Sequence, residues 1–201
     1  MKIVLDKVSK RFNQNWLFKE LDYQFTFGSS YAITGANGTG KTTLLKIISG
    51  MIPCSKGTID HFLDDKKLEP DHLYKYLSFV APYMEIPEEL SFNEFLKFHF
   101  TLKRKIKGYS IPDIALSAGL SHAAHKPLHT FSSGMKQRAK LAMGFFSETP
   151  VLLLDEPTTN LDLAGTQWYR QEMKKLRPDK LLIISSNQTS EYDFCDHVIS
   201  L

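Results

Sequence analysis

The sequence predicts an α/β fold whose core is a mostly parallel β-sheet flanked by helices, with an antiparallel β-subdomain at the N-terminus. Two observations lead to this prediction. In the last third of the chain, apolar strands alternate with helices, and this order builds a parallel sheet covered on both faces. In the first third, short strands follow one another, which favours antiparallel pairing. The length of 201 residues suits one domain with room for an inserted subdomain.

Composition excludes several classes of protein. Hydrophobic residues make up an ordinary 42% of the chain, and no run of roughly 18 apolar residues is present to span a membrane. The N-terminus lacks the apolar region of a signal peptide. Cys54 and Cys195 lack metal-ligand spacing, so we expect reduced thiols in a cytosolic protein. The densest basic run, Lys103–Lys107, is interpreted as a solvated helix end, and no nucleic-acid partner is expected.

Strands and one helix are expected in the first 82 residues. The expected strands are Ile3–Leu5, Leu21–Phe27, Tyr31–Thr34, Gly57–Phe62 and Tyr76–Val80. The second of these alternates apolar and polar residues, as a half-buried strand does, and Gly28 ends it. A helix is expected over Lys41–Ser49, because Gly50 and Pro53 follow it as stop signals.

The remaining elements follow the same rules. Ser91 and Glu94 have capping-box spacing and predict a helix start, and the apolar stripe of this helix is expected to serve core or partner packing. The expected elements after it are a short helix from Pro112 to near Gly119, a helix after Gly134, a strand over Val151–Leu154, a helix at about Leu163–Leu176, a strand over Leu181–Ser186, a short helix, and a strand over His197–Leu201.

The segment GANGTGKT fits the phosphate-binding pattern G-x-x-x-x-G-K-[ST], with a strand before it and a helix after it. Its residues are Gly35, Ala36, Asn37, Gly38, Thr39, Gly40, Lys41 and Thr42. The glycines let backbone N–H groups point at phosphate oxygens, Lys41 brings a positive charge, and the Thr42 hydroxyl is a ligand for Mg²⁺. Thr43, which follows, completes the loop's predicted nucleotide-binding set. The loop alone does not separate a kinase, a GTPase or a transport ATPase.

A second candidate site lies at the end of the apolar segment VLLLDEP, residues 151–157. In an open α/β sheet the carboxyl ends of the strands face the ligand crevice. Asp155 is therefore placed to hold Mg²⁺, directly or through water, and Glu156 to act as the general base that polarises an attacking water.

A third segment, FSSGMKQR at residues 131–138, has hydroxyls and a glycine before a basic helix, which is typical of an anion-binding helix N-terminus. In the order GANGTGKT, FSSGMKQR, VLLLDEP and TTNLD, the chain resembles the ATP-binding subunit of an ABC transporter over nearly its whole length. The resemblance implies a P-loop NTPase of ABC type, one ABC ATPase domain over residues 1–201, and an α-helical subdomain inserted at about residues 83–130.

The resemblance also implies nucleotide-contacting residues outside the phosphate loop. Ser132, Ser133, Gly134 and Met135 stand at the family's signature sequence, and Asp162 closes the D-loop that crosses the dimer interface. Phe12 stands where the family places an aromatic that stacks on adenine. Two alternatives stay open there, because Trp16 competes for the role and Phe12 could be an edge-strand core residue.

Two positions depart from the family pattern. Tyr83 or Pro82 stands where the family carries a glutamine that reaches Mg²⁺ and the attacking water, and neither has a carboxamide. Asn187 stands where the family carries a histidine that contacts the γ-phosphate. It can donate a hydrogen bond but carries no positive charge. We therefore expect ATP hydrolysis that is slow but real.

The function implied by the resemblance is ATP hydrolysis, with Mg²⁺ as cofactor, that powers transport through a separate membrane-spanning subunit. Two ATPase subunits would pair as a homodimer or a heterodimer. The chain would be cytoplasmic, held at the inner face of the cell membrane by its partner, without a regulatory C-terminal domain. Its compact length resembles that of the haem-export ATPase of cytochrome c maturation and of small multidrug-type export ATPases.

Three alternatives to this function remain. The first is a soluble ABC-type ATPase that acts on ribosomes or DNA, the second is a small-molecule or nucleoside kinase, and the third is a switch that binds ATP without hydrolysing it. Cargo and direction of transport stay open.

Overall fold

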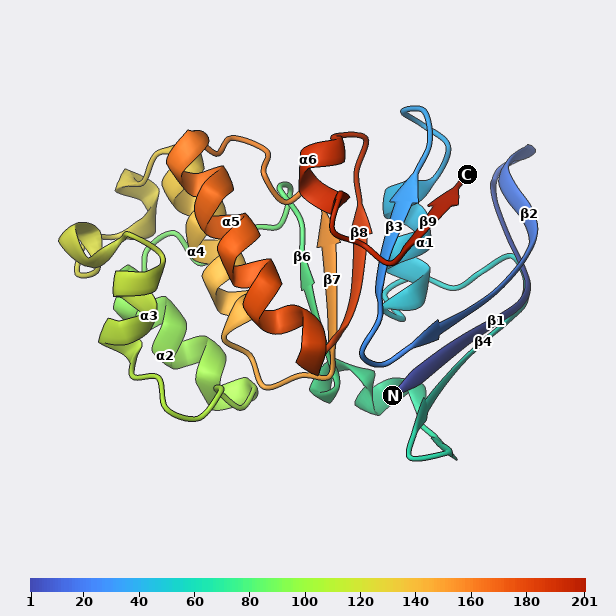
Figure 1. Ribbon diagram of the computed structural model, residues 1–201, viewed down its shortest axis with the longest axis horizontal. Coiled ribbons are helices and arrows are strands. Elements are labelled where there is room, and N and C mark those ends of the chain that lie inside the picture. The colour runs from blue at the N-terminus through green and yellow to red at the C-terminus, as the bar shows by residue number, and fades with distance from the viewer. The chain divides into compact units, whose positions relative to one another are not determined.

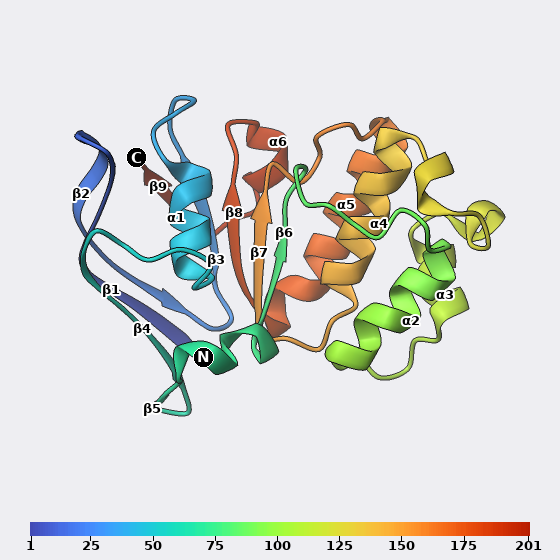
Figure 2. The ribbon, with the colours of Figure 1, turned by 180° about the vertical axis from the view of Figure 1, so that it is seen from behind.

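The computed structural model describes residues 1–201, apart from the side chain of Arg177. The chain forms two compact units (Figures 1 and 2). Unit one comprises Met1–Phe79, Pro150–Glu156 and Arg177–Leu201, and unit two comprises Val80–Thr149 and Pro157–Leu176. The expected helical segment, residues 83–130, falls inside unit two, which also takes in later helices. That residues 1–201 act as one domain stays a prediction.

A five-stranded sheet carries the core of unit one. Its strands run in the order β6 (Leu77–Val80), β7 (Val151–Asp155), β8 (Leu181–Ser185), β3 (Ser30–Thr34) and β9 (His197–Ser200). β7 and β8 are buried along their whole length, as their continuous apolar sequences predict for a parallel sheet. The pairings β7–β8, β8–β3 and β3–β9 are all parallel, so the predicted fold class is confirmed.

A second, antiparallel sheet is built from β2 (Asn15–Thr26), β1 (Lys2–Phe12), β4 (Lys56–Leu63) and β5 (Lys66–Lys67), in that order. The antiparallel pairing is confirmed, but the expected length of the first strand, Ile3–Leu5, is wrong. Register shifts after Leu5 and Val8 interrupt the alternation of buried and exposed residues, so the sequence pattern hides the rest of β1. Phe27 was also expected in a strand, but it lies beyond the end of β2 and is exposed.

Helices complete unit one. α1 (Lys41–Ile48) follows β3 and packs against β7 and β8, and Figure 2 shows it in front of β3. Gly50 has a φ of 77° and donates to Ile47 O, so it ends the helix as its position predicts. The other helices are η1 (Pro70–Lys75), η4 (Arg177–Asp179) and α6 (Thr189–Tyr192).

Unit two is helical. Its elements are α2 (Phe92–Leu102), α3 (Ile111–Ser117), η2 (Ser121–Ala123), η3 (Leu128–Thr130), α4 (Ser133–Phe145) and α5 (Leu163–Leu176). The capping box of Ser91 and Glu94 is formed in both directions, as predicted. The apolar stripe of α2 divides, because Phe92, Phe95 and Leu96 are buried whereas Leu102 is exposed. α4 starts at Ser133, two residues earlier than the expected start after Gly134.

Among the residues that the structure describes, no helix is long and apolar enough to cross a lipid bilayer. Cys54 and Cys195 are both half-buried, and neither forms a disulfide within the part of the chain that the structure describes.

A buried histidine makes the stability of unit two depend on pH. Burial, and then the charge of Lys103, lower the pKa of His99 from 6.5 to about 4, while its Nε2 lies 2.9 Å from Ser147 Oγ. Between these two pH values the unfolded chain binds a proton that the folded chain does not, so acidification favours unfolding. The contribution of His99 to stability is therefore full above about pH 6.5 and is lost progressively toward pH 4.

We expect urea unfolding of the wild type to show lower stability at about pH 5 than at about pH 7, and His99→Gln to reduce that difference. A residual slope should remain, because burial also lowers the pKa of His61 in unit one. The exposed His125 is the matched control, and His125→Gln should keep the wild-type slope. An equal slope in His99→Gln and the wild type would contradict the assignment.

Candidate functional site

The predicted phosphate loop, residues 35–42, joins β3 to α1 in unit one. Gly35, Gly38 and Gly40 have φ values of 145°, 88° and 106°, which other residues rarely adopt. A Cβ at Gly35 would lie 2.7 Å from the backbone oxygen of Leu201, so the backbone passes there too closely for any side chain. The sequence pattern of spaced glycines therefore reflects backbone conformation and close packing.

The loop ends at the N-terminus of α1 in a way that suits an anion. Gly40 is the N-cap residue and provides no side-chain hydrogen bond to the first turn. The Lys41 side chain is buried, and its Nζ donates to Gly35 O at 2.7 Å and to Ala36 O at 3.3 Å. A cation is thus held inside the loop beside uncapped helix N–H groups, and this arrangement fits a phosphate.

Thr42 and Asp155 meet at the carboxyl edge of the sheet. Asp155 is 2% exposed, and its Oδ2 accepts a hydrogen bond from Thr42 Oγ1 at 2.6 Å. The other carboxylate oxygen, Oδ1, is buried without a hydrogen-bond partner among the described residues. A buried carboxylate oxygen next to a hydroxyl, beside a phosphate loop, is the kind of oxygen donor set that Mg²⁺ prefers. The two predicted metal ligands are therefore close together and fit that ion.

Glu156 follows directly and occupies the left-handed region, with a φ of 41°. A residue other than glycine adopts this conformation uncommonly, in turns or where neighbouring contacts hold it. Its N–H donates to Ser185 O at 2.8 Å, and its side chain is exposed. A carboxylate that stands in solvent at the strand end can act as a base toward water.

Asn187 lies beside the phosphate loop. It follows β8, and its Nδ2 donates to Asn37 Oδ1 at 3.1 Å. Both side chains are exposed, so this amide can also donate to a ligand held by the loop. The parallel strands β3, β7 and β8 end at the same edge (Figure 1), and this brings the loop, Asp155 and Asn187 together.

Phe12, the expected adenine-stacking residue, ends β1 and is 53% exposed. It is therefore not a core residue of the edge strand, and this alternative is wrong. Lys10 Nζ lies 5.0 Å from its ring centroid. The competing ring of Trp16 is less exposed and is contacted by Arg11, Lys19 and Lys56 at 5.4, 5.4 and 5.7 Å. Phe12 is thus the more accessible of the two rings for stacking.

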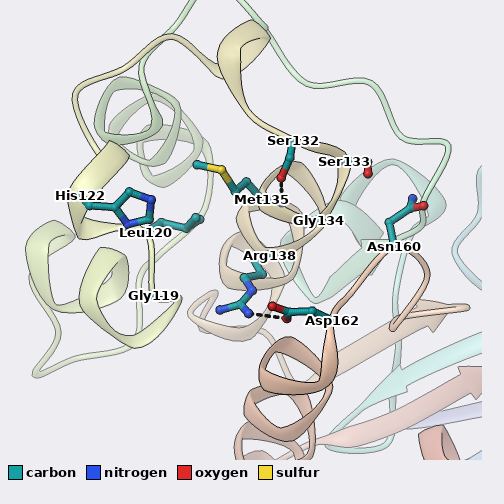
Figure 3. Close-up of a pocket in the computed structure, with 10 residues that line it drawn as sticks. All are labelled: Gly119, Leu120, His122, Ser132, Ser133, Gly134, Met135, Arg138, Asn160 and Asp162. Atoms are coloured by element: carbon teal, nitrogen blue, oxygen red, sulfur yellow. Dashed lines mark hydrogen bonds and ion pairs between the residues drawn. The ribbon is translucent and has the colours of Figure 1, made fainter.

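In unit two, the signature-like segment, residues 131–138, lines a cavity of about 420 Å³ (Figure 3). Ser132 caps α4, since its Oγ accepts from Met135 N at 3.2 Å, and Ser133 is exposed beside it. A Cβ at Gly134 would lie 2.8 Å from Asn160 O, so glycine is needed for this close approach. The lining residues are Gly119, Leu120, His122, Ser132, Ser133, Gly134, Met135, Arg138, Asn160 and Asp162.

An ion pair connects the signature-like segment to the D-loop. Arg138 Nη2 lies 2.7 Å from Asp162 Oδ1, which also accepts from Gly165 N at 2.7 Å, and Figure 3 shows Arg138 reaching from α4 to Asp162. The hydrogen bond from Gly165 N–H, and then that from the guanidinium, lower the pKa of Asp162. Arg138 and His122 were not predicted as site residues, although Arg138 had a sequence signal as the basic end of FSSGMKQR. Asn160 belongs to TTNLD, which the resemblance placed at the D-loop with Asp162.

The loop that follows β6 contains the two candidates for the missing glutamine position. Tyr83 is 50% exposed, and Pro82 O accepts a hydrogen bond from Lys140 Nζ at 2.5 Å. Both residues belong to unit two. Neither side chain has a carboxamide. That one of them replaces the family's glutamine stays a prediction.

Known proteins support one family. Residues 18–159 match the family model described as ABC transporter. The chain is 31% identical to the uncharacterized ABC transporter ATP-binding protein YhcH of Bacillus subtilis (strain 168), and the match covers 100% of this chain and 68% of that protein. It is 33% identical to the cytochrome c biogenesis ATP-binding export protein CcmA of Bradyrhizobium diazoefficiens, over 76% and 74% of the two chains. The chain spans 64% to 68% of the length of three Bacillus subtilis relatives.

Solved structures agree on the fold. The dimeric structure of MJ0796, described as a bacterial ABC transporter cassette, has a TM-score of 0.84. It is 24% identical, and the match covers 99% of this chain and 94% of that one. This likeness shows that the two chains share a fold.

The close approach at Gly35 can be tested by comparison with Gly38. Both have positive φ, but a Cβ at Gly38 would meet nothing within 4 Å, whereas one at Gly35 meets backbone. We expect Gly35→Ala to lower the free energy of unfolding by about 2–4 kcal/mol and Gly38→Ala by about 1 kcal/mol. Urea unfolding of both variants measures this, and equal losses would show that packing at Gly35 adds nothing to the backbone strain.

Proposed function

Because this chain belongs to the ABC transporter family, we propose that it is an ATP-binding and ATP-hydrolysing subunit that powers transport through a separate membrane-spanning subunit. The observation that carries the proposal is the meeting of Thr42 and Asp155 at 2.6 Å beside a strained glycine loop, with one carboxylate oxygen unsatisfied. This arrangement supports binding of a triphosphate with its metal ion. The order of the motifs in the chain supports the transporter class.

In the proposed site, the Gly35–Thr42 loop and the N-terminus of α1 hold the phosphates, and Lys41 neutralises part of their charge. Thr42 and Asp155 would hold Mg²⁺, which supplies charge neutralisation for the β- and γ-phosphates. The exposed ring of Phe12 stacks on adenine, since stacking needs only a π-face. ATP and Mg²⁺ are thus the proposed ligands of unit one.

Hydrolysis needs a base and a donor near the γ-phosphate. Glu156 accepts the proton of the water that attacks the γ-phosphorus, and ADP leaves as the bond to the bridging oxygen breaks. Asn187 donates a hydrogen bond to a γ-phosphate oxygen, as its position 3.1 Å from Asn37 of the loop allows. The absence of an imidazolium there, and of a glutamine at Tyr83 or Pro82, weakens transition-state stabilisation more than it weakens ATP binding. Hydrolysis is therefore slow, and binding of the membrane subunit accelerates it.

The signature-like segment in unit two completes the ATP site of a second ATPase subunit. The Ser132 hydroxyl, the Gly134 backbone and the N-terminus of α4 form an anion-binding surface within a cavity of about 420 Å³. The γ-phosphate held by the partner's loop fits this surface, so ATP joins two subunits in a homodimer or a heterodimer. The D-loop, ending at Asp162, lines the same cavity and lies at this interface.

The membrane subunit docks on unit two. Phe98 and Leu102 of α2 are 52% and 64% exposed, which provides apolar surface for an apolar partner. The chain then works in the cytoplasm, held at the inner face of the membrane by this partner.

Single-turnover hydrolysis tests the catalytic roles. We expect Glu156→Gln to slow hydrolysis by about 100-fold or more while ATP still binds, because a carboxamide cannot accept the water's proton. Asn187→His should raise the rate by restoring a group that can carry positive charge. Binding of a fluorescent ATP analogue, measured in parallel, separates loss of chemistry from loss of affinity.

An unchanged rate in Glu156→Gln would show that another group is the base. If no variant hydrolyses ATP even when bound to membranes that contain the partner subunit, a binding-only switch replaces the proposed ATPase.

Ser132→Arg tests the shared site. The exposed Ser132 can accept a large cation with little effect on packing, whereas even alanine at Gly134 would meet Asn160 O at 2.8 Å. We expect Ser132→Arg to abolish ATP-dependent dimerisation, measured by light scattering, and to leave ATP binding to the monomer within about twofold. The exposed Thr58 of β4, which lies outside this cavity, offers the control Thr58→Arg, which should dimerise normally. Loss of monomer binding in Ser132→Arg would overturn the assignment.

A further inference from the structure

Two lysines one helical turn apart on α4, Lys136 and Lys140, contact the loop that follows β6. Lys140 Nζ donates to Pro82 O at 2.5 Å, and Lys136 Nζ lies 2.6 Å from Glu88 Oε1. Like charges at this spacing on a helix repel one another. Oxygen acceptors of the loop, one for each lysine, offset this repulsion.

The two lysines differ in burial, and this separates their roles. Lys140 is 7% exposed, whereas the Lys136 side chain is 25% exposed and its partner Glu88 is 47% exposed. An exposed ion pair contributes little to stability, but a buried ammonium needs an acceptor. Burial, and then the charge of Lys136, lower the pKa of Lys140, while Glu88 counteracts this. Lys140 is thus the stronger anchor, and Pro82 O is its acceptor.

Backbone hydrogen bonds continue the attachment along the loop. His129 N donates to Glu88 O and Leu128 N donates to Leu90 O, both at 2.9 Å. These bonds hold the far end of the loop, residues 88–90, to the segment that leads into α4. At the near end, around Pro82, the contact from Lys140 is a side-chain hydrogen bond that joins the loop to α4.

Pro82, which accepts the hydrogen bond from Lys140, lies close to a boundary between the two units. The chain passes from unit one to unit two between residues 79 and 80, so the loop is the first part of unit two. α4 begins at Ser133, inside the segment assigned above to the partner's phosphate. A fixed contact between Pro82 and α4 makes the start of unit two and this phosphate-binding segment move as one body.

We propose that Lys140 is a positioning residue that fixes the Pro82–Glu88 loop to α4, so that displacement of the loop moves the signature-like segment with it. The loop's attachment follows from the geometry alone, while its effect on hydrolysis rests on the proposed ATPase function. Lys140 touches neither nucleotide nor metal in this proposal. It acts by removing flexibility between the loop and the helix.

Hydrogen exchange of the full-length protein tests the attachment without any ATPase measurement. We expect amides of residues 82–90 to exchange about tenfold faster in Lys140→Met, with amides in the α2 and α3 core unchanged. Lys140→Arg, which keeps the charge and the donors, should restore protection. Lys126→Met, at an exposed lysine of the same unit, is the matched control and should match the wild type.

Steady-state hydrolysis tests the coupling. Lys140→Met should lower kcat by about tenfold while KM for ATP stays within about twofold, because the phosphate loop lies in unit one. Unchanged exchange of residues 82–90, or equal acceleration throughout unit two, would overturn the proposal. If Lys140→Met does not fold, Lys140→Gln, which removes the ammonium and keeps a polar side chain, should raise exchange of the same amides by about threefold, and no change there would also overturn it.

The two proposals fail in different ways. A wild-type protein without ATPase activity would contradict the proposed function and would leave the exchange result standing. Normal hydrolysis together with unchanged exchange in Lys140→Met would contradict the role of Lys140 alone.

Discussion

The parallel pairing of β7, β8 and β3 is the constraint on which the chemistry of unit one depends. Ser185 of β8 pairs with Asp155 of β7 on one side and with Ile33 of β3 on the other, so the three strands end at one level. Each strand then passes into a segment with polar side chains: the phosphate loop, Glu156 and Asn187. A register slip by one residue would turn Asp155 to the opposite face of the sheet and separate it from Thr42. The register thus brings the proposed metal ligand, the proposed base and the predicted phosphate loop together.

Backbone conformation supplies the second requirement. The phosphate loop needs glycine where φ is positive. At Gly35 of this loop, and at Gly134 of α4, a neighbouring backbone oxygen also leaves no room for a Cβ. Glu156 adopts a left-handed conformation without being glycine. Such strain persists only where neighbouring contacts hold it, and the bond from its N–H to Ser185 O is one of them. Close backbone approach and local strain are thus present at residues assigned to phosphate and water, and they also occur in the antiparallel sheet, at Gly57 and Lys7 among others.

Unit two depends on cations that hold loops to α4. Arg138 pairs with Asp162 of the D-loop, and Lys140 holds Pro82 O of the loop after β6. Both side chains come from one helix, whose N-terminus carries the signature-like segment. α4 is therefore joined to two loops by hydrogen bonds to charged groups, which are stronger than bonds between neutral groups. This arrangement supports the proposed role of Ser132 at a partner's nucleotide.

Local sequence patterns determined the fold class, the phosphate loop, the buried strands β7 and β8 and the cap of α2, because each depends on residues close together in the chain. They did not determine the full length of β1, whose bulges conceal the alternation. Nor did they determine contacts between Thr42 and Asp155, 113 residues apart, or between Asn37 and Asn187, 150 residues apart. Such contacts depend on where the strands place the backbone, and no short stretch of sequence contains that information. Residue chemistry identified the groups that can act, and only the tertiary structure decided which of them meet.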